Sequence, residues 1–216
     1  MTRDFASFIK FGEKEHMEKL HFEGEVYCKP ISYFNQIEEK DFRGDKNDGV
    51  AYLKQIKDIR FKHQGMTIAT ALKGQLYGRN PKDIGNIYCL FGLATENLNL
   101  ELKESQKLNI NLNGVNFGDT AVWIYDPGEF KKRVEKALKK NNYEFNFSPV
   151  VYLDYSKYEG ELSPFTKSDI YKPQSEVRFW IPNQKNCDLK INIGNISDIS
   201  GILPVDIFDK LEYEPI

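Results

Sequence analysis

The stretch QSEVRFWI, residues 174–181, carries the clearest structural signal in the chain. Its apolar and polar side chains alternate, which is the period of a β-strand. The apolar side chains share one face, which we expect to join the core: Val177, Phe179 and Ile181. The opposite face collects an amide, a carboxylate, a guanidinium and an indole: Gln174, Glu176, Arg178 and Trp180.

The polar face of this strand has two interpretations. In the first, the strand faces solvent and Glu176 and Arg178 form ordinary ion pairs. In the second, the strand lines a cleft, and neighbouring groups hold the Glu176 carboxylate ionised and oriented. The alternation is compatible with both interpretations, so other parts of the chain have to decide between them.

Strand patterns recur on both sides of this stretch. Residues 86–94 (NIYCLFGLA) form an almost continuous apolar run, which is typical of a strand buried on both faces. Strands and helices do not alternate regularly, so we predict an α+β domain with a mixed, largely antiparallel arrangement of two packed sheets. Other expected strands cover residues 5–11, 25–28, 50–61, 66–72, 108–112, 120–125, 150–154 and 189–193.

Few helices are expected. The clearest begins after Asp126, a good N-cap that is followed by Pro127 at the first helical position. A core-facing stripe with helical spacing follows the cap, and it consists of Phe130, Val134, Ala137 and Leu138. A second helix is expected over residues 13–23, ended by Gly24, and a short third one over residues 204–211.

Composition narrows the protein class. The chain has 216 residues, 40% of them hydrophobic and 13% aromatic, which fits a single folded domain over residues 1–216. No run of about 18 uncharged apolar residues is present, so no membrane association is expected. The first residues show no signal-peptide pattern, and the three cysteines are widely spaced, so we predict a reduced, cytoplasmic protein. The net charge of −2 gives no global basic footprint for nucleic acid.

The loop FRGDKNDG, residues 42–49, is a second candidate site. Its glycines permit close approach of a ligand, and Arg43 has the bidentate geometry that suits phosphate. The alternative is an ordinary polar turn. Asp45 and Asp48 also suggest calcium, but no EF-hand spacing follows. No metal is therefore predicted.

Several blocks in order resemble bacterial proteins with an ADP-ribosyltransferase-like fold, and more distantly the DarT-type toxins that modify nucleic acid. The resemblance covers most of the chain, and its sharpest part is Gln174-Ser175-Glu176, which matches the Q-x-E transferase motif. The blocks are FIKFGEKEHMEKL, GEVYCKPISYFN, RGDKNDG, IYCLFGL, GDTAVWIYDPGEFKKRV and YKPQSEVRFWI, which start at residues 8, 24, 43, 87, 118 and 171.

The resemblance implies NAD as co-substrate and two catalytic residues. Glu176 would stabilise the cationic ribose that forms when the nicotinamide bond breaks, and Gln174 would orient the acceptor. The remaining site residues would bind NAD, with Arg43 or Lys10 on the phosphates and the Tyr33 or Phe34 ring on the nicotinamide. They are Lys10, Ser32, Tyr33, Phe34, Arg43 and Arg178. Tyr33 and Glu176 should then share one cleft with the Arg43 loop at its rim.

The resemblance also implies a setting. Such a protein would act as a toxin or phage-defence effector on an acceptor macromolecule, either nucleic acid or a host or phage protein, and an antitoxin or other regulatory partner would fit that role. Two alternatives stay open. One is a non-catalytic module on the same fold that binds a nucleotide or a protein. The other is a metal-dependent nuclease that uses Asp45, Asp48 and Glu176.

Overall fold

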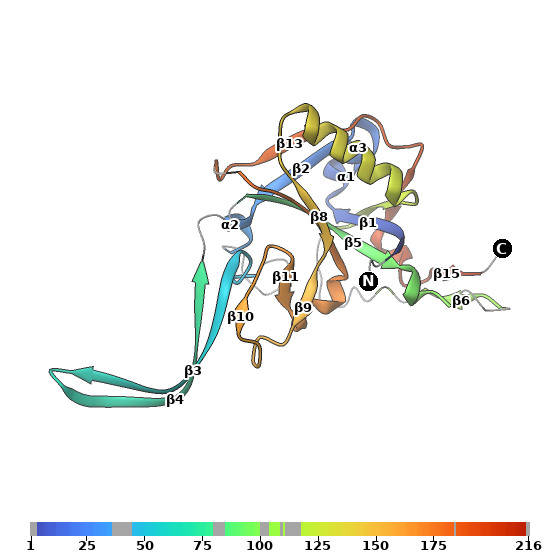
Figure 1. The fold of residues 1–216 in the computed structure, drawn as a ribbon. Helices are drawn as coiled ribbons and strands as arrows, with labels where there is room; N and C mark the ends of the chain where they lie inside the picture. Colours follow the sequence, from blue (N-terminus) through green and yellow to red (C-terminus); the bar gives the residue numbers. More distant parts are fainter. Residues whose placement is uncertain are drawn as a thin grey trace.

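The computed structural model describes residues 4–35, 45–79, 85–99, 104–108, 110, 118–183 and 185–214. It is a mixed α+β structure with mostly antiparallel strands and few helices, which confirms the predicted class (Figure 1). The predicted pair of packed sheets is not found in the described residues, because the main strands join in one eight-stranded sheet that branches at a central strand. Its strands are β1 (Phe5–Gly12), β2 (Glu25–Pro30), β5 (Asn86–Ala94), β7 (Thr120–Ile124), β8 (Asn146–Pro149), β12 (Glu176–Ile181), β13 (Leu189–Asn192) and β14 (Ser200–Pro204).

The branch at β5 creates a wedge. At Phe91, β5 pairs with Ile9 of β1 on one edge and with Glu176 of β12 on the other. At Ile87, it pairs with Lys29 of β2 and again with β12. Because a strand has two edges, β1 and β2 must share the edge opposite β12, and they diverge between residues 87 and 91.

Helices cover this sheet. α3 (Pro127–Lys140) has the predicted bounds, and the Asp126 carboxylate accepts a hydrogen bond from the Glu129 amide at 2.8 Å. Its predicted apolar stripe is buried in the main core. α1 (Lys14–Glu18) continues as a π-helix (Lys19–Glu23), which ends at Gly24 with φ of 69°. At that angle an L side chain would be strained, and a Cβ would also meet Gly194, so glycine is required there.

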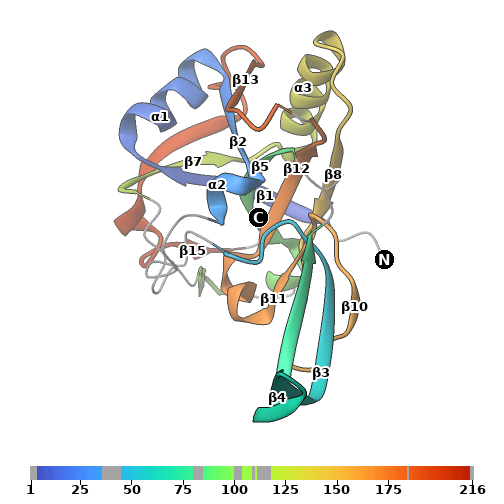
Figure 2. The ribbon, with the colours of Figure 1, turned by 90° about the vertical axis from the view of Figure 1, so that its left-hand side faces the viewer.

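One hairpin leaves the body of the protein. β3 (Val50–His63) and β4 (Met66–Arg79) pair along 14-residue strands, and β10 (Gly160–Glu161) joins β3 at Tyr52 and Leu53. The base of the hairpin is anchored, since Val50 and Leu53 pack with Tyr155 in a small separate core. Beyond its base the hairpin projects away from the rest of the chain in both ribbon views (Figure 1, Figure 2).

Smaller elements complete the structure. β9 (Val151–Leu153) and β11 (Thr166–Ser168) form a parallel pair beside the cavity described below. β6 (Gln106–Lys107) pairs with β15 (Glu212–Tyr213). The short helices are α2 (Ile31–Phe34) and the 3-10 helices Thr95–Asn97, Asp169–Gln174 and Val205–Ile207.

One expectation about secondary structure is corrected, and another falls partly outside the described residues. The helix predicted over residues 204–211 is wrong, because strand β14 runs to Pro204 and only one 3-10 turn follows it. The alternating stretch 108–112 falls partly outside the described residues, although Leu108 and Ile110 are both buried as their spacing predicted. Within the described ranges, no helix has the length and apolar character needed to cross a membrane.

Candidate functional site

A cavity of about 340 Å³ lies where β1 and β2 diverge. Its walls come from β1, α1, β2, α2, β5, β11 and β12, together with the 3-10 helix that precedes β12. This volume lies in the range of small-molecule sites, which is roughly 300–1,000 Å³. The cavity therefore gathers segments that are distant in sequence around a space large enough for a ligand.

Lys10 lies on the β1 side of this wedge. Its Nζ donates a hydrogen bond to the Cys89 carbonyl at 2.8 Å and lies 4.7 Å from the centre of the Tyr88 ring. Cys89 belongs to the part of β5 between the stretches paired with β1 and β2. Lys10 therefore places a cationic group in the cavity, and its predicted contact with NAD stays a prediction.

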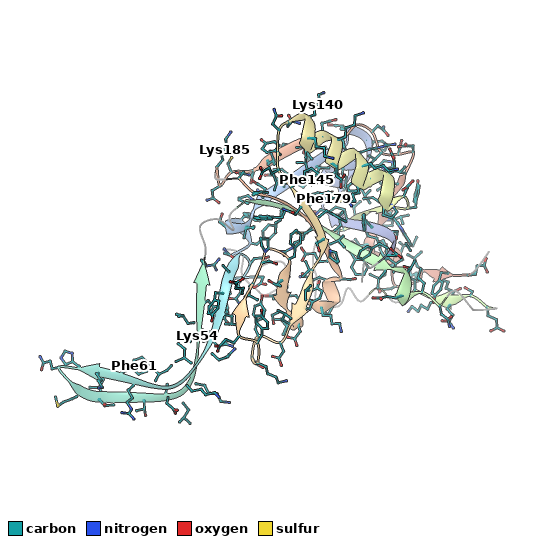
Figure 3. All side chains as sticks on the ribbon, in the orientation of Figure 1. Lys54, Phe61, Lys140, Phe145, Phe179 and Lys185 are labelled. Atoms are coloured by element: carbon teal, nitrogen blue, oxygen red, sulfur yellow. The ribbon has the colours of Figure 1, made fainter. Side chains whose placement is uncertain are left out.

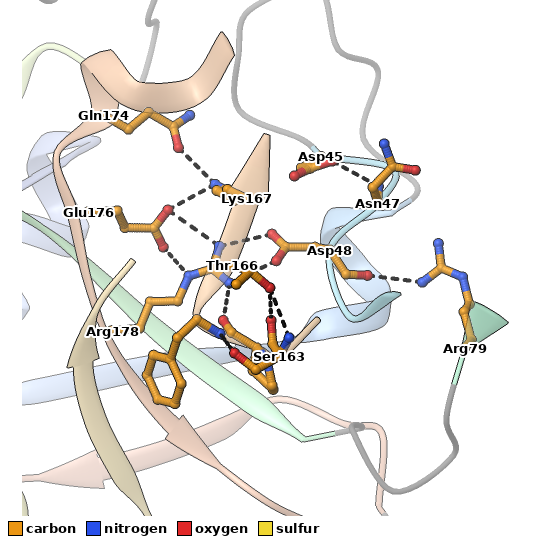
Figure 4. Close-up of polar contacts among 12 residues, drawn as sticks. Asp45, Asn47, Asp48, Arg79, Ser163, Thr166, Lys167, Gln174, Glu176 and Arg178 are labelled. Atoms are coloured by element: carbon orange, nitrogen blue, oxygen red, sulfur yellow. Dashed lines mark hydrogen bonds and ion pairs between the residues drawn. The ribbon is translucent and has the colours of Figure 1, made fainter. Parts of the chain in front are cut away.

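A cluster of four charged side chains forms one wall of the cavity (Figure 4). The Arg178 guanidinium donates to both oxygens of Asp48, at 2.7 and 3.0 Å, and to the Glu176 carboxylate. Lys167 donates to Glu176 at 2.8 Å. All four side chains are buried, with exposures of 0% for Arg178, 2% for Asp48, 5% for Lys167 and 6% for Glu176.

Electrostatics keeps the buried carboxylate of Glu176 ionised. Burial by itself raises the pKa of Glu176, but the charges of Arg178 and then Lys167 outweigh that effect and hold the pKa well below its usual range. Burial likewise lowers the pKa of Lys167, and the nearby Glu176 carboxylate more than reverses this, so the pKa of Lys167 is raised. Glu176 and Lys167 thus stabilise each other in their ionised forms.

Asp45 is a fifth charged residue beside this cluster, and its environment differs. It is 2% exposed, its Oδ1 accepts the Asn47 amide at 2.8 Å, and its buried Oδ2 has no hydrogen-bond partner. Burial, followed by repulsion from the Asp48 carboxylate, raises the pKa of Asp45 from 3.8 to about 6. The Asp45 carboxyl therefore titrates near neutral pH, unlike Glu176.

Gln174 lies on a different secondary-structure element from the one predicted. It ends the 3-10 helix Asp169–Gln174, and Ser175 then adopts a left-handed conformation with φ of 40°, so strand β12 begins only at Glu176. The prediction that Gln174 shares the strand face with Glu176 is therefore wrong. Its side chain nevertheless lines the cavity and accepts a hydrogen bond from Lys167 at 2.7 Å, which places it beside Glu176.

Two aromatic rings also line the cavity. Tyr33 and Phe34 line the cavity from α2, with ring centroids 5.5 Å apart, although a strand was expected there. The Lys29 ammonium lies 4.6 Å from the centre of the Tyr33 ring and 3.0 Å from the Asp188 carboxylate. The expectation that Ser32 lies in the same cavity is not met, because its hydroxyl donates to the Asn186 side chain and Ser32 does not line the cavity.

Three residues that line the cavity were not predicted from the sequence as binding or catalytic residues of this site, and one predicted residue lies outside the described part of the chain. Lys167 carried no periodic or motif signal, and Lys29 lay in a strand pattern without any distinguishing neighbour. Asp48 was considered only for a metal. Arg43 lies outside the described residues, so its predicted contact with phosphate stays a prediction.

A metal centre finds no support in the described part of the chain, which holds no group of three or more suitable histidine, cysteine or acidic side chains. Among the three carboxylates of the nuclease alternative, the Arg178 guanidinium lies between Asp48 and Glu176 and bonds to both. A cation there would have to displace a buried arginine.

Comparison with known proteins gives no assignment for this site. No protein-family model, no curated protein and no solved structure matches the chain. The chemistry of the cavity must therefore be inferred from its own residues.

Proposed function

We propose that this protein has an ADP-ribosyltransferase-like fold, binds NAD in the cavity and transfers ADP-ribose to a macromolecule. One observation carries the proposal. Residues chosen from sequence on three separate segments line a single cavity, although up to 168 positions separate them. They are Lys10, Tyr33, Phe34, Gln174, Glu176 and Arg178.

The reaction would use the negative charge of Glu176. When the bond between nicotinamide and the ribose C1′ breaks, its electron pair leaves with neutral nicotinamide, and positive charge develops on the ribose. An ionised carboxylate beside that ribose stabilises the transition state. The acceptor then forms a new bond to C1′ and loses a proton. Arg178 and Lys167 would act as positioning residues that keep Glu176 ionised and fixed.

The other walls suit the remaining parts of NAD. The rings of Tyr33 and Phe34 offer apolar surface for stacking on a nicotinamide or adenine. Lys10 and Lys29 enter the cavity from the two diverging strands and supply positive charge for a diphosphate. A dinucleotide therefore has complementary chemistry along the wedge.

A second candidate function is a binding module without catalysis. Both oxygens of Glu176 already accept hydrogen bonds from Arg178 or Lys167, so a ribose hydroxyl would compete with buried ion pairs. This observation favours a structural role for the cluster, with the cavity binding a nucleotide that is not cleaved.

Nicotinamide release from NAD tests the proposal. Glu176→Gln keeps the shape of the side chain and removes its charge, so turnover should fall about 10²–10³-fold while NAD still binds. Because Glu176 is buried in ion pairs, its loss should also lower the melting temperature in either case. Turnover and NAD affinity should therefore be compared at a temperature at which both proteins are folded.

Glu25→Gln is the matched control. Glu25 lines the same cavity but forms an ion pair at 3.1 Å with Lys190 at the surface, so its substitution should leave turnover within a few fold. NAD binding without turnover in the wild type would support the binding module. Equal turnover in wild type and Glu176→Gln would exclude Glu176 as the catalytic residue.

A further inference from the structure

The projecting part of the β3–β4 hairpin, residues 54–76, is here called the arm. Figure 3 places Lys54 near the base of the hairpin and Phe61 on its outer part, away from the body of the protein. Large apolar side chains are exposed along the arm, at 50% for Phe61, 67% for Met66, 68% for Ile68, 81% for Leu72 and 55% for Leu76. A concentration of exposed apolar residues of this kind marks an interaction surface.

The two edges of the arm differ in charge. The β3 strand carries basic residues along its length, and charged side chains, especially lysine, are a common protection of an edge strand against pairing. They are Lys54, Lys57, Arg60 and Lys62. The β4 strand contains the stretch MTIATAL, residues 66–72, in which no residue is charged.

The β4 edge is also unpaired, and its register with β3 shifts once within this stretch, at Ile68. Among the described strands, the order of this sheet is β10, β3, β4, so β4 is a terminal strand and its outer backbone groups have no strand beside them. Every residue from 66 to 70 is exposed, as is Leu72. A long uncharged edge is a template for pairing with another strand.

We propose that residues 66–72 of β4 pair in antiparallel fashion with the same residues of a second copy of this chain. The two arms would then form one continuous four-stranded sheet, in the order β3, β4, β4 and β3. Such contact is isologous, because each copy offers the same surface, so it closes at a dimer and leaves no free β4 edge in this stretch.

The sequence of the stretch is self-complementary in one register. Ile68 is the extra residue of a β-bulge against β3, since Phe61 pairs with Ala69 and Lys62 with Thr67, so the new strand pair has to accommodate that bulge. With Ala69 opposite Ala69 of the partner subunit, Ile68 faces Thr70 of the partner subunit, and Met66 faces Leu72 of the partner subunit. Each apolar side chain then lies beside an apolar or small one. The next charged residue, Lys73, falls opposite the Gly65 of the partner's turn, so no two like charges face each other across the new pair.

Charge on the outer strands does not oppose this pairing strongly. The two β3 strands would be separated by three strand spacings, roughly 14 Å, which exceeds the screening length of about 8 Å at physiological salt. A nucleic acid would instead need basic groups at the contact, and in the arm these lie mainly on β3. The uncharged edge therefore fits a protein strand better than a phosphate backbone.

The test measures the molar mass of the full chain by light scattering and sedimentation over a concentration series, at low and high salt. We expect a concentration-dependent dimer that salt does not weaken. Ile68→Lys places two ammonium groups near the two-fold axis and should raise the dimer dissociation constant about tenfold or more. Leu76→Lys is the matched control, since it adds the same charge to β4 outside residues 66–72 and should leave the dimer intact.

Cross-linking checks the register independently of folding. In a Cys187→Ser background, which removes an exposed thiol, Ala69→Cys should form a disulfide-linked dimer on mild oxidation, because the paired Cα atoms would lie within the roughly 4.4–6.8 Å that a disulfide spans. A monomer at all concentrations would overturn the proposal, as would a dimer that persists unchanged in Ile68→Lys. Binding of the monomer to duplex DNA or to anionic vesicles through the arm, lost at high salt, would also overturn it.

Discussion

The charged wall of the cavity and the arm depart from the usual distribution of side chains in opposite directions. In the cavity, Arg178 is fully buried and Lys167 is 5% exposed, whereas on the arm Leu72 is 81% exposed. Burying ions costs free energy unless each is paired, and exposing large apolar groups leaves hydrophobic stabilisation unused. Each departure therefore marks a place where the sequence serves something other than folding of the single chain.

The two regions should respond differently to substitution. Every ion in the cavity wall relies on its neighbours, because Arg178 alone bonds to Asp48, to Glu176 and to the Pro164 carbonyl at 2.6 Å. The arm instead contacts the body near its base, where the Gln55 and Gln75 amides donate to the Tyr155 carbonyl, and its outer part is held by its own strand pairing. Removing one charge from the wall should disturb the fold, whereas removing one apolar group from the arm should not.

The largest effect is expected for Arg178→Met. The substitution leaves the carboxylates of Asp48 and Glu176 buried without their main cation, which costs about 3–5 kcal/mol in comparable cases. The free energy of unfolding, measured with urea, should fall by that amount. Arg133→Met is the control, because Arg133 bonds to Glu129 and Asp198 at the surface of α3 and should cost about 0–1 kcal/mol. Equal losses in the two variants would show that burial of the cluster has no special importance.

A somewhat smaller effect of opposite sign is expected for Asp45→Asn. The pKa of Asp45 is raised from 3.8 to about 6, so the ionised carboxylate destabilises the folded protein above that pH, and the penalty disappears as pH falls toward 4. The amide keeps an oxygen for the Asn47 amide and removes the repulsion from Asp48. The variant should be more stable than the wild type by up to about 3 kcal/mol at pH 7.5.

The pH dependence is the decisive part of this measurement. At about pH 4.5 the advantage of Asp45→Asn should shrink to roughly a third, because the wild-type carboxyl is then protonated in the folded protein, while the unfolded chain, with its ordinary pKa of 3.8, is still mostly ionised. Unfolding curves at both pH values therefore form one experiment. A variant that is less stable than the wild type at pH 7.5 would show that Lys167 and Arg178 already compensate the charge of Asp45.

Sequence periodicity predicted which face of a strand or helix packs in the core, but it did not predict what lies against the other face. The bounds of β5, β12 and α3 follow from apolar spacing and capping, since these local signals coincide with the tertiary packing. The same alternation could not tell that the polar face of β12 lines a cavity. It also gave no sign that β3 and β4 leave the body, because that depends on whether another layer covers them.

The site was predictable only in part, for a related reason. Glu176 and Tyr33 share a cavity because β1 and β2 diverge along β5, and no local pattern encodes that divergence. Lys167 joins the site through the parallel pairing of β11 with β9, a contact between strands of three residues each. Short strands of this kind carry too few residues for a periodic signal.

The smallest effect is expected for Leu76→Ala in the hairpin, and Leu53→Ala provides the comparison at a buried position of the same hairpin. Leu53 is completely buried at the base and packs with Val50 and Tyr155, so Leu53→Ala should cost about 2–5 kcal/mol. Leu76 is 55% exposed and lies outside residues 66–72, so Leu76→Ala should change the free energy of unfolding by less than about 0.5 kcal/mol and leave the dimer unaffected. A loss at Leu76 comparable to that at Leu53 would mean that the arm packs against the body in solution, and the contrast between the arm and the cavity wall would then fail.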